Sequence, residues 1–310
     1  MLLDIVIIIG CTVGLGYGAT LIVEAASRMS RRLGVSELVI GLTVVAFGTS
    51  APEFAITIAA TLKDQADISV SNVVGSNIFN LGFILGSVIM VRAIQTNKKL
   101  VYREGLVLIG ATLVLLFFMR DLTLQRYEGF FMLSLLFIYI GYLFYQRETP
   151  IDEIPEGDFE WRDIPRFLAG IVLIVTSGHF LVDSAVDIAR VLGISEWVIG
   201  VTIVAAGTSA PEMATSLIGV LRGHEGISLG NLIGSDLFNL LGVLGLAGII
   251  QAGTMQIDPA GMNSLILLSG MVILVVIMMR TGWRLTRWEG ALLISINLLR
   301  WIIDFTTTTS

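Results

Sequence analysis

Charge, cysteine and histidine are all scarce in this chain. Charged residues make up 14% of its 310 residues, whereas soluble domains carry about 25%. The single Cys11 cannot support a disulfide framework, and the start Met-Leu-Leu-Asp lacks the basic region of a cleavable signal peptide, so we expect none. The net charge of −6 comes largely from the acidic stretch between Asp152 and Asp163, so it gives no reason to expect a nucleic-acid partner. With 55% apolar residues, the composition predicts an integral membrane protein with almost no mass outside the bilayer.

Ten apolar segments each come near the ~20 residues that a membrane-spanning helix requires. They cover approximately residues 3–27, 35–62, 68–91, 101–119, 125–146, 165–190, 194–221, 227–250, 260–280 and 286–304. The one long polar stretch, residues 147–164, is acidic and contains prolines, so we expect it to link a first half, 1–146, to a second half, 165–310. The predicted fold is an all-α membrane protein with ten transmembrane helices, five in each half.

The two halves are repeats of one another. Between Leu33–Glu53 and Leu192–Glu212, 16 of 21 positions are identical, at an offset of 159 residues. The repeated motifs extend over about 41–86 and 200–245. Because five spans are an odd number, the second half enters the membrane from the opposite side, which makes an inverted-topology repeat. That arrangement is typical of secondary transporters, whose ion sites lie near the bilayer midplane between the repeats.

Lysine and arginine are unevenly divided between alternate loops. One set of loops contains 14 of these residues, including those of the 147–164 linker, and the other set contains 5. Since positive residues favour the cytoplasmic side, we expect the linker to be cytoplasmic and both termini to lie outside the cell. The predicted location is the cell membrane, crossed several times.

Each half carries Gly-Thr-Ser-Ala-Pro-Glu inside an apolar segment, at Gly48–Glu53 and at Gly207–Glu212. Pro52 has no N–H, and its ring clashes with the carbonyl four residues earlier. We therefore expect the helix to open there and to free the carbonyls near Ala46, Gly48 and Thr49. Pro211 is expected to do the same in the second copy, near Ala205 and Gly207.

The motif offers only oxygen ligands. The hydroxyls of Thr49 and Ser50 and the carboxylate of Glu53 lie within one turn, and the second copy repeats them as Thr208, Ser209 and Glu212. Hard cations prefer such ligands, and Ca²⁺ accepts six to eight of them. His179 and His224 lie outside the motif, which argues against zinc or copper. Two facing carboxylates would suit one Ca²⁺ or more than one Na⁺. Without a bound cation, two such charges would be costly in the membrane.

A second element follows each copy. It reads Asn72-x-x-Gly75-Ser76-Asn77-x-x-Asn80, and returns as Asn231-x-x-Gly234-Ser235-Asp236-x-x-Asn239. Residues four apart share a helix face, so Ser76 and Asn80 are expected to complete the oxygen shell, as are Ser235 and Asn239. Gly75 and Gly234 are expected to let helices approach closely. For Asn72 and Asn231, hydrogen bonding to neighbouring helices is an equally good reading.

These paired motifs resemble the two α-repeats of the cation/Ca²⁺ exchanger superfamily, most closely those of prokaryotic sodium/calcium exchangers. The resemblance covers nearly the whole chain and implies an antiporter of Na⁺ and Ca²⁺, with no cofactor and a monomer sufficient for transport. It implies a central Ca²⁺ held by Glu53, Glu212 and the carbonyls of Thr49 and Thr208. It also implies flanking Na⁺ sites that use Ala46, Ser50, Ser76, Ala205, Ser209 and Ser235. The first and sixth helices would slide as a pair to alternate access.

One position departs from the family pattern. Many members carry an aspartate where this chain has Asn239, and here the acid stands three residues earlier, at Asp236, opposite Asn77 in the other repeat. Without an acid at 239, potassium dependence is less expected. Asp236 could face the site, stand behind it or titrate protons. H⁺/Ca²⁺ exchange and K⁺-dependent Na⁺/Ca²⁺ exchange remain alternatives, and a cation channel is a further one.

An intramembrane enzyme is not expected, because no His or Lys stands beside Ser50 or Ser209 to activate a nucleophile.

Overall fold

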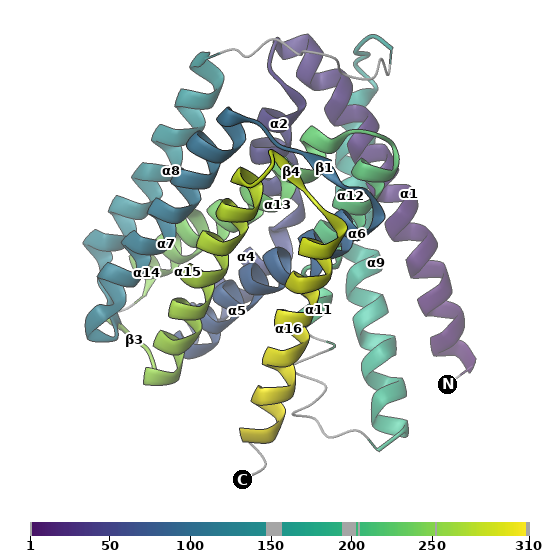
Figure 1. Ribbon diagram of the computed structural model, residues 1–310. Helices are drawn as coiled ribbons and strands as arrows, with labels where there is room; N and C mark the ends of the chain where they lie inside the picture. The colour runs from purple at the N-terminus through teal and green to yellow at the C-terminus, as the bar shows by residue number, and fades with distance from the viewer. Residues whose placement is uncertain (1, 147–156, 194–202, 204, 252, 308–310) are drawn as a thin grey trace.

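The protein is predominantly helical in a computed structural model that describes residues 2–146, 157–193, 203, 205–251 and 253–307 (Figure 1). The first half contains α1 (Leu2–Leu33), α2 (Glu37–Ile40), η1 (Gly41–Val45), α3 (Ala46–Thr49), α4 (Ala51–Leu62), α5 (Ala66–Phe79), η2 (Asn80–Ile84), α6 (Leu85–Val91), β1 (Ile94–Gln95), η3 (Leu100–Gly105), α7 (Leu106–Phe118), η4 (Met119–Asp121), β2 (Thr123–Leu124) and α8 (Arg126–Gln146). The second half contains α9 (Asp163–Val191), α11 (Ala205–Thr208), α12 (Ala210–Leu221), α13 (Glu225–Leu237), η6 (Phe238–Val243), α14 (Leu244–Ile250), β3 (Met255–Gln256), α15 (Pro259–Arg280), β4 (Arg284–Leu285) and α16 (Arg287–Thr307).

Seven helices within these residues are long and apolar enough to cross a membrane, and an eighth span is obtained if Glu37–Thr49 and Ala51–Leu62 count as one bent helix. The count therefore does not reach the ten spans expected from the sequence. In the expected span 194–221, residues 194–202 and 204 lie outside the described part of the chain, which leaves the 4-residue α11 and the 12-residue α12. In the expected span 286–304, α16 carries Arg287, Glu289 and Arg300 among its 21 residues. Of the expected linker 147–164, residues 147–156 also lie outside the described part.

Two short antiparallel β-ribbons lie at opposite ends of the bundle. At one end β1 pairs with β4, with Ile94 opposite Leu285. At the other end β2 pairs with β3, with Thr123 opposite Gln256. Each ribbon joins a strand of the first half to a strand of the second half, so the halves are connected at both ends of the bundle.

The two halves also meet closely in the middle of the bundle, where α13 packs against α2, η1 and α3. A Cβ atom added to Gly230 would lie 2.5 Å from the carbonyl oxygen of Leu38, and one added to Gly234 would lie 2.5 Å from that of Leu42. Close approach at Gly234 is thus confirmed. For Gly75, no described atom lies within 4 Å of such a Cβ. The residues equivalent to Leu42 and Ala46 in the other repeat are 201 and 205, and their side chains lie outside the described set.

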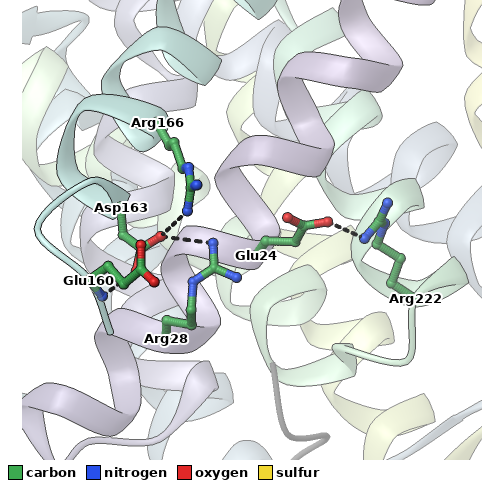
Figure 2. A network of polar contacts seen from close by, with 6 residues as sticks. All are labelled: Glu24, Arg28, Glu160, Asp163, Arg166 and Arg222. Carbon is green, nitrogen blue, oxygen red and sulfur yellow. Dashed lines mark hydrogen bonds and ion pairs between the residues drawn. The ribbon is translucent and has the colours of Figure 1, made fainter. Parts of the chain in front are cut away.

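An ionic network ties the end of α1 to two other elements (Figure 2). Arg28 lies 2.8 Å from the carboxylate of Asp163 at the start of α9, and Arg166 lies 3.2 Å from the same carboxylate. Asp163 also accepts the backbone N–H of Glu160 at 2.8 Å. Glu24, one turn earlier on α1, pairs with Arg222 after α12 at 2.5 Å. α1 is therefore bonded both to the start of α9 and to the residue that follows α12.

Replacing Asp163 by asparagine is expected to lower the Tm of the detergent-purified protein. The side chain of Asp163 is fully buried and that of Arg28 is 11% exposed, and hydrogen bonds to buried charged groups contribute about 1.5–3 kcal/mol each. Differential scanning fluorimetry measures the shift. Asp187→Asn is the matched control, because Asp187 is 62% exposed and pairs with an exposed Arg190, and such pairs contribute about 0–1 kcal/mol. Equal Tm values for the two variants would contradict the stabilising role of the network.

Candidate functional site

Both copies of the proline motif interrupt a helix at the serine. In the first copy α3 ends at Thr49, Ser50 has φ −77° and ψ 10°, and α4 begins at Ala51 with Pro52 in its first turn. In the second copy α11 ends at Thr208, Ser209 has φ −90° and ψ 10°, and α12 begins at Ala210 with Pro211 in its first turn. The helix axis bends by 50° at the first break. The breaks expected from Pro52 and Pro211 are present.

The break frees fewer carbonyls than expected. The backbone N–H of Ser50 donates to the carbonyl of Ala46 at 3.0 Å, and the Thr49 hydroxyl also approaches that oxygen, at 3.3 Å. The expectation that Ala46 offers a free carbonyl is therefore wrong. Ser50 still has an N–H and continues the helix as far as Thr49, whereas only Pro52 lacks the donor that would have reached Gly48. In the second copy Ala205 begins α11, and its side chain lies outside the described set.

The two glutamates are held by the opposite repeat. The hydroxyl of Ser50 donates to Oε1 of Glu212 at 3.0 Å, and the hydroxyl of Ser209 donates to Oε1 of Glu53 at 3.1 Å. All four side chains are buried, and both glutamates are fully inaccessible to solvent. Each serine therefore bonds to the glutamate of the other repeat and not to the glutamate three residues later in its own motif. The two motif copies therefore form one site with two carboxylates.

Hydroxyls from the neighbouring helices reach the same place. Ser235 donates to Oε1 of Glu212 at 3.4 Å, and Ser76 approaches the carboxylate of Glu53. The Thr49 hydroxyl donates to Oδ1 of Asn231 at 2.9 Å and lies 3.3 Å from Oγ of Ser235. Thr208, the counterpart of Thr49, is half-buried at the end of α11.

Asp236 faces the same region and joins a network of amides. Nδ2 of Asn80 donates to Oδ1 of Asp236 at 3.1 Å, and Nδ2 of Asn77 donates to the carbonyl oxygen of Asp236 at 3.1 Å. Nδ2 of Asn239 donates to Oδ1 of Asn77 at 3.0 Å. Asn80 and Asn239 each stand where an α-helix passes into a π-helical segment, η2 or η6, and such segments are frequent at functional sites.

Five oxygen atoms of this region are buried and have no hydrogen-bond partner within the described residues. They are Oε2 of Glu53, Oε2 of Glu212, Oδ1 of Asn80, Oδ1 of Asn239 and Oδ2 of Asp236. Buried polar atoms are almost always satisfied, so each exception requires a reason. All five are acceptors of the kind that hard cations bind. The arrangement is therefore suited to a cation more than to a hydrogen-bonded core.

Thr57 and Ser216 support the glutamates and were not identified from the sequence. Nδ2 of Asn72 bonds to the carbonyl of Glu53 at 3.2 Å and to the Thr57 hydroxyl at 3.0 Å. In the second copy Nδ2 of Asn231 bonds to the carbonyl of Glu212 at 3.3 Å and to the Ser216 hydroxyl at 3.0 Å. The two supporting residues are separated by 216 − 57 = 159 positions, the offset of the repeats, and that offset is the signal that identifies them.

Comparison with known proteins gives consistent matches over nearly the whole chain. The model of the family described as sodium/calcium exchanger protein matches residues 3–146 and 164–300. The chain is 31% identical over 332 residues to the sodium/calcium exchanger MaX1 of Methanosarcina acetivorans, covering 93% of this chain and 94% of MaX1. It is 37% identical over 257 residues to the inner membrane protein YrbG of Escherichia coli, covering 78% of each. A solved structure of the sodium-calcium exchanger NCX_Mj superposes with a TM-score of 0.84 at 28% identity, covering 99% of both chains.

Proposed function

Because the chain belongs to the sodium/calcium exchanger protein family, we propose that it exchanges Na⁺ for Ca²⁺ across a membrane by alternating access. The observation that carries this proposal is the pair of fully buried glutamates, each bonded by a serine of the opposite repeat and each with a second oxygen that has no partner among the described residues. A site with about −2 of charge in a membrane should rarely be without cations. Na⁺ and Ca²⁺ then share the same carboxylates, so each loads after the other has left.

The full architecture is ten transmembrane helices in two inverted repeats, 1–146 and 165–310. The reciprocal hydrogen bonds between Ser50 and Glu212 and between Ser209 and Glu53 support it, because they relate the motif copies by a pseudo-twofold exchange. The loop contacts support it as well. Each contact between loops, such as β1 with β4 or β2 with β3, joins two loops that this topology places on the same side of the membrane.

The ligands of the ions come from both repeats. Ca²⁺ is bound between Glu53 and Glu212, with the carbonyls of Thr49 and Thr208. The flanking Na⁺ ions use serine hydroxyls and neighbouring oxygens. The wider set includes Ser50, Ser76, Asn77, Asn80, Ala205, Ser209, Ser235, Asp236 and Asn239. Two observations support this assignment. The described polar side chains of this set are buried, and several of their oxygen atoms have no hydrogen-bond partner among the described residues.

The protein is a multi-pass membrane protein, and we place its 147–164 linker in the cytoplasm and both termini outside. The excess of Lys and Arg in the linker's set of loops supports this orientation. Figure 1 is consistent with it, since the first turn of α1 and the last turn of α16 lie toward the same end of the bundle, away from the start of α9. The crossed bonds join residues of one chain, which supports a monomer as sufficient for transport.

An ion-substitution flux assay tests the function. Purified protein in proteoliposomes is expected to take up ⁴⁵Ca²⁺ when an outward Na⁺ gradient is imposed, with saturation and with no uptake in choline. Uptake driven equally by a pH gradient would favour the H⁺/Ca²⁺ alternative, and uptake that requires K⁺ beside Na⁺ would favour the K⁺-dependent one. Ca²⁺ flux that persists without any counter-ion would indicate a channel and contradict exchange.

Ser50→Ala and Ser209→Ala are expected to weaken Ca²⁺ uptake by similar factors. Each removes one hydrogen bond to the glutamate of the opposite repeat, and a hydrogen bond to a charged group contributes about 1.5–3 kcal/mol, partly offset by water or ions at the site. We expect the half-saturating Ca²⁺ concentration to rise roughly fivefold to tenfold. Ser71→Ala is the control, since the exposed Ser71 hydroxyl bonds, among the described residues, only to the Ile68 carbonyl. A strong effect at one serine alone would argue against the reciprocal arrangement.

A further inference from the structure

A cavity of about 540 Å³ lies away from the ion site, where the β1–β4 ribbon meets the start of α16. It is lined by Arg92, Ala93, Arg284, Thr286 and Arg287. Three of these five residues are arginines, and none is acidic. We call this cavity the arginine pocket. It brings together residues from the first half, after α6, and from the second half, around β4.

The positive charge of the arginine pocket is only partly neutralised. Nε of Arg92 lies 3.0 Å from Oε1 of Glu225. Nη2 of Arg287 donates to the carbonyl of Val91 at 3.3 Å, which provides no negative charge. Within the described residues, the guanidinium of Arg284 forms neither an ion pair nor a hydrogen bond.

A second carboxylate next to the pocket in the sequence, that of Glu289, accepts hydrogen bonds from Thr286. Oε2 of Glu289 accepts the backbone N–H of Thr286 at 2.7 Å and the Thr286 hydroxyl at 2.8 Å. Glu289 thereby begins α16 with a local cap instead of pairing with an arginine. Two guanidinium groups therefore face the pocket without a carboxylate partner in the described part of the chain, which is the condition for binding an anion from outside.

The chemistry of the pocket favours phosphate. Guanidinium groups bind phosphate oxygens through paired N–H donors, and arginine is preferred over lysine for this purpose. Basic pockets between transmembrane helices bind the head groups of anionic lipids. A volume of about 540 Å³ exceeds the needs of one phosphate ion and is within the range of small-molecule sites.

The surroundings of the pocket favour a lipid as the source of the phosphate. Apolar side chains next to the lining residues are exposed, with Met90 43%, Val91 42% and Trp288 86% accessible. Such side chains are suited to contact acyl chains, and Trp is favoured at membrane interfaces. We propose that the arginine pocket binds the phosphate of an anionic lipid head group, with the acyl chains lying along Val91 and Trp288.

Lipid titration of the purified protein tests this inference independently of transport. The Tm in a neutral detergent is measured against increasing phosphatidylglycerol, with phosphatidylcholine as the zwitterionic comparison and inorganic phosphate as a separate arm. Phosphatidylglycerol is expected to raise the Tm of the wild-type protein, and phosphatidylcholine is not. In Arg284→Gln/Arg287→Gln the apparent affinity is expected to fall roughly 30-fold, because the variant loses two guanidinium groups that would bond to the phosphate directly, each contributing about a fivefold factor.

Arg32→Gln/Arg162→Gln is the matched control. It removes two exposed arginines outside the pocket, and its titration should match that of the wild type. Since Arg287 also bonds to Val91, Arg284→Gln alone replaces the double variant if the latter does not fold, with an expected loss of about fivefold. Competition of inorganic phosphate with phosphatidylglycerol supports a phosphate site that free anions also reach. The proposal is overturned if phosphatidylglycerol has no effect on the wild type, or if the pocket variants respond as the control does.

Discussion

Glu53→Gln and Glu212→Gln are each expected to abolish Na⁺-driven Ca²⁺ uptake. Glutamine keeps the shape of the side chain and an oxygen that can still accept the hydrogen bond of Ser209 or Ser50, so the change removes mainly charge. A divalent cation between the two side chains then meets one negative charge in place of two. In a low-dielectric interior this loss cannot be compensated by water. We expect ⁴⁵Ca²⁺ uptake in proteoliposomes to fall to the level of empty vesicles.

Glu24→Gln is the control for these two variants. Glu24 lies on α1, is 29% exposed and pairs with Arg222, so the substitution removes the same charge away from the site. Its uptake should remain close to that of the wild type. The Tm of Glu53→Gln and Glu212→Gln should be at least that of the wild type, since one buried charge has been removed. Wild-type uptake by either glutamine variant would contradict the assignment of the ion ligands.

Gly234→Ala is expected to lower the stability strongly for the addition of a single methyl group. The new Cβ would lie 2.5 Å from the carbonyl oxygen of Leu42 and 2.7 Å from the Cβ of Ala46, and backbone atoms cannot turn away as a flexible side chain can. Overpacking of this kind costs about 1–3 kcal/mol or more. Because Ser235 and Asn231 lie on the same helix, separation of α13 from η1 would also disturb the ion site. We expect a lower Tm together with loss of Ca²⁺ uptake.

Gly270→Ala provides the comparison for this substitution. Gly270 lies within α15, and no described atom is within 4 Å of a Cβ placed there. Alanine is the better helix former by about 1 kcal/mol, so this variant should be as stable as the wild type or slightly more stable. If Gly234→Ala were as stable and as active as Gly270→Ala, the close contact between α13 and η1 would not be required.

Much of the site could be predicted from residues whose effect is local. A proline within an apolar helical pattern removes a backbone donor and clashes with the preceding turn, so the interruptions at Pro52 and Pro211 followed from the sequence. The direction of the serines did not follow. Ser50 is three residues before Glu53, a spacing that places two side chains on one face of an unbroken helix. The break changes that relation, and Ser50 bonds to Glu212 instead.

Asp236 and the number of spans show where the sequence was insufficient. Asp236 follows Ser235 and precedes Asn239 by three residues, so helical spacing alone allowed it to face the site or a neighbouring helix. The π-helical segments η2 and η6 shift the faces of α5 and α13 at Asn80 and Asn239, and no periodicity in the sequence indicates them. The expectation of ten spans relied on length and apolarity. The described residues give seven long helices and one bent pair, because residues 194–202 and 204 lie outside them and one further helix, α16, carries charges.

The crossed hydrogen bonds have a consequence for how such a protein can evolve. Ser50 donates a hydrogen bond to Glu212, and Ser209 donates one to Glu53. A substitution of either serine therefore removes a hydrogen bond from the glutamate of the other copy. A substitution at one of these four positions is therefore expected to require a compensating change in the other copy. Asn77 and Asp236 occupy equivalent positions but have different side chains and different bonds. This position, on α5 and α13 next to Ser76 and Ser235, is therefore one at which the two repeats differ without a change in the crossed bonds.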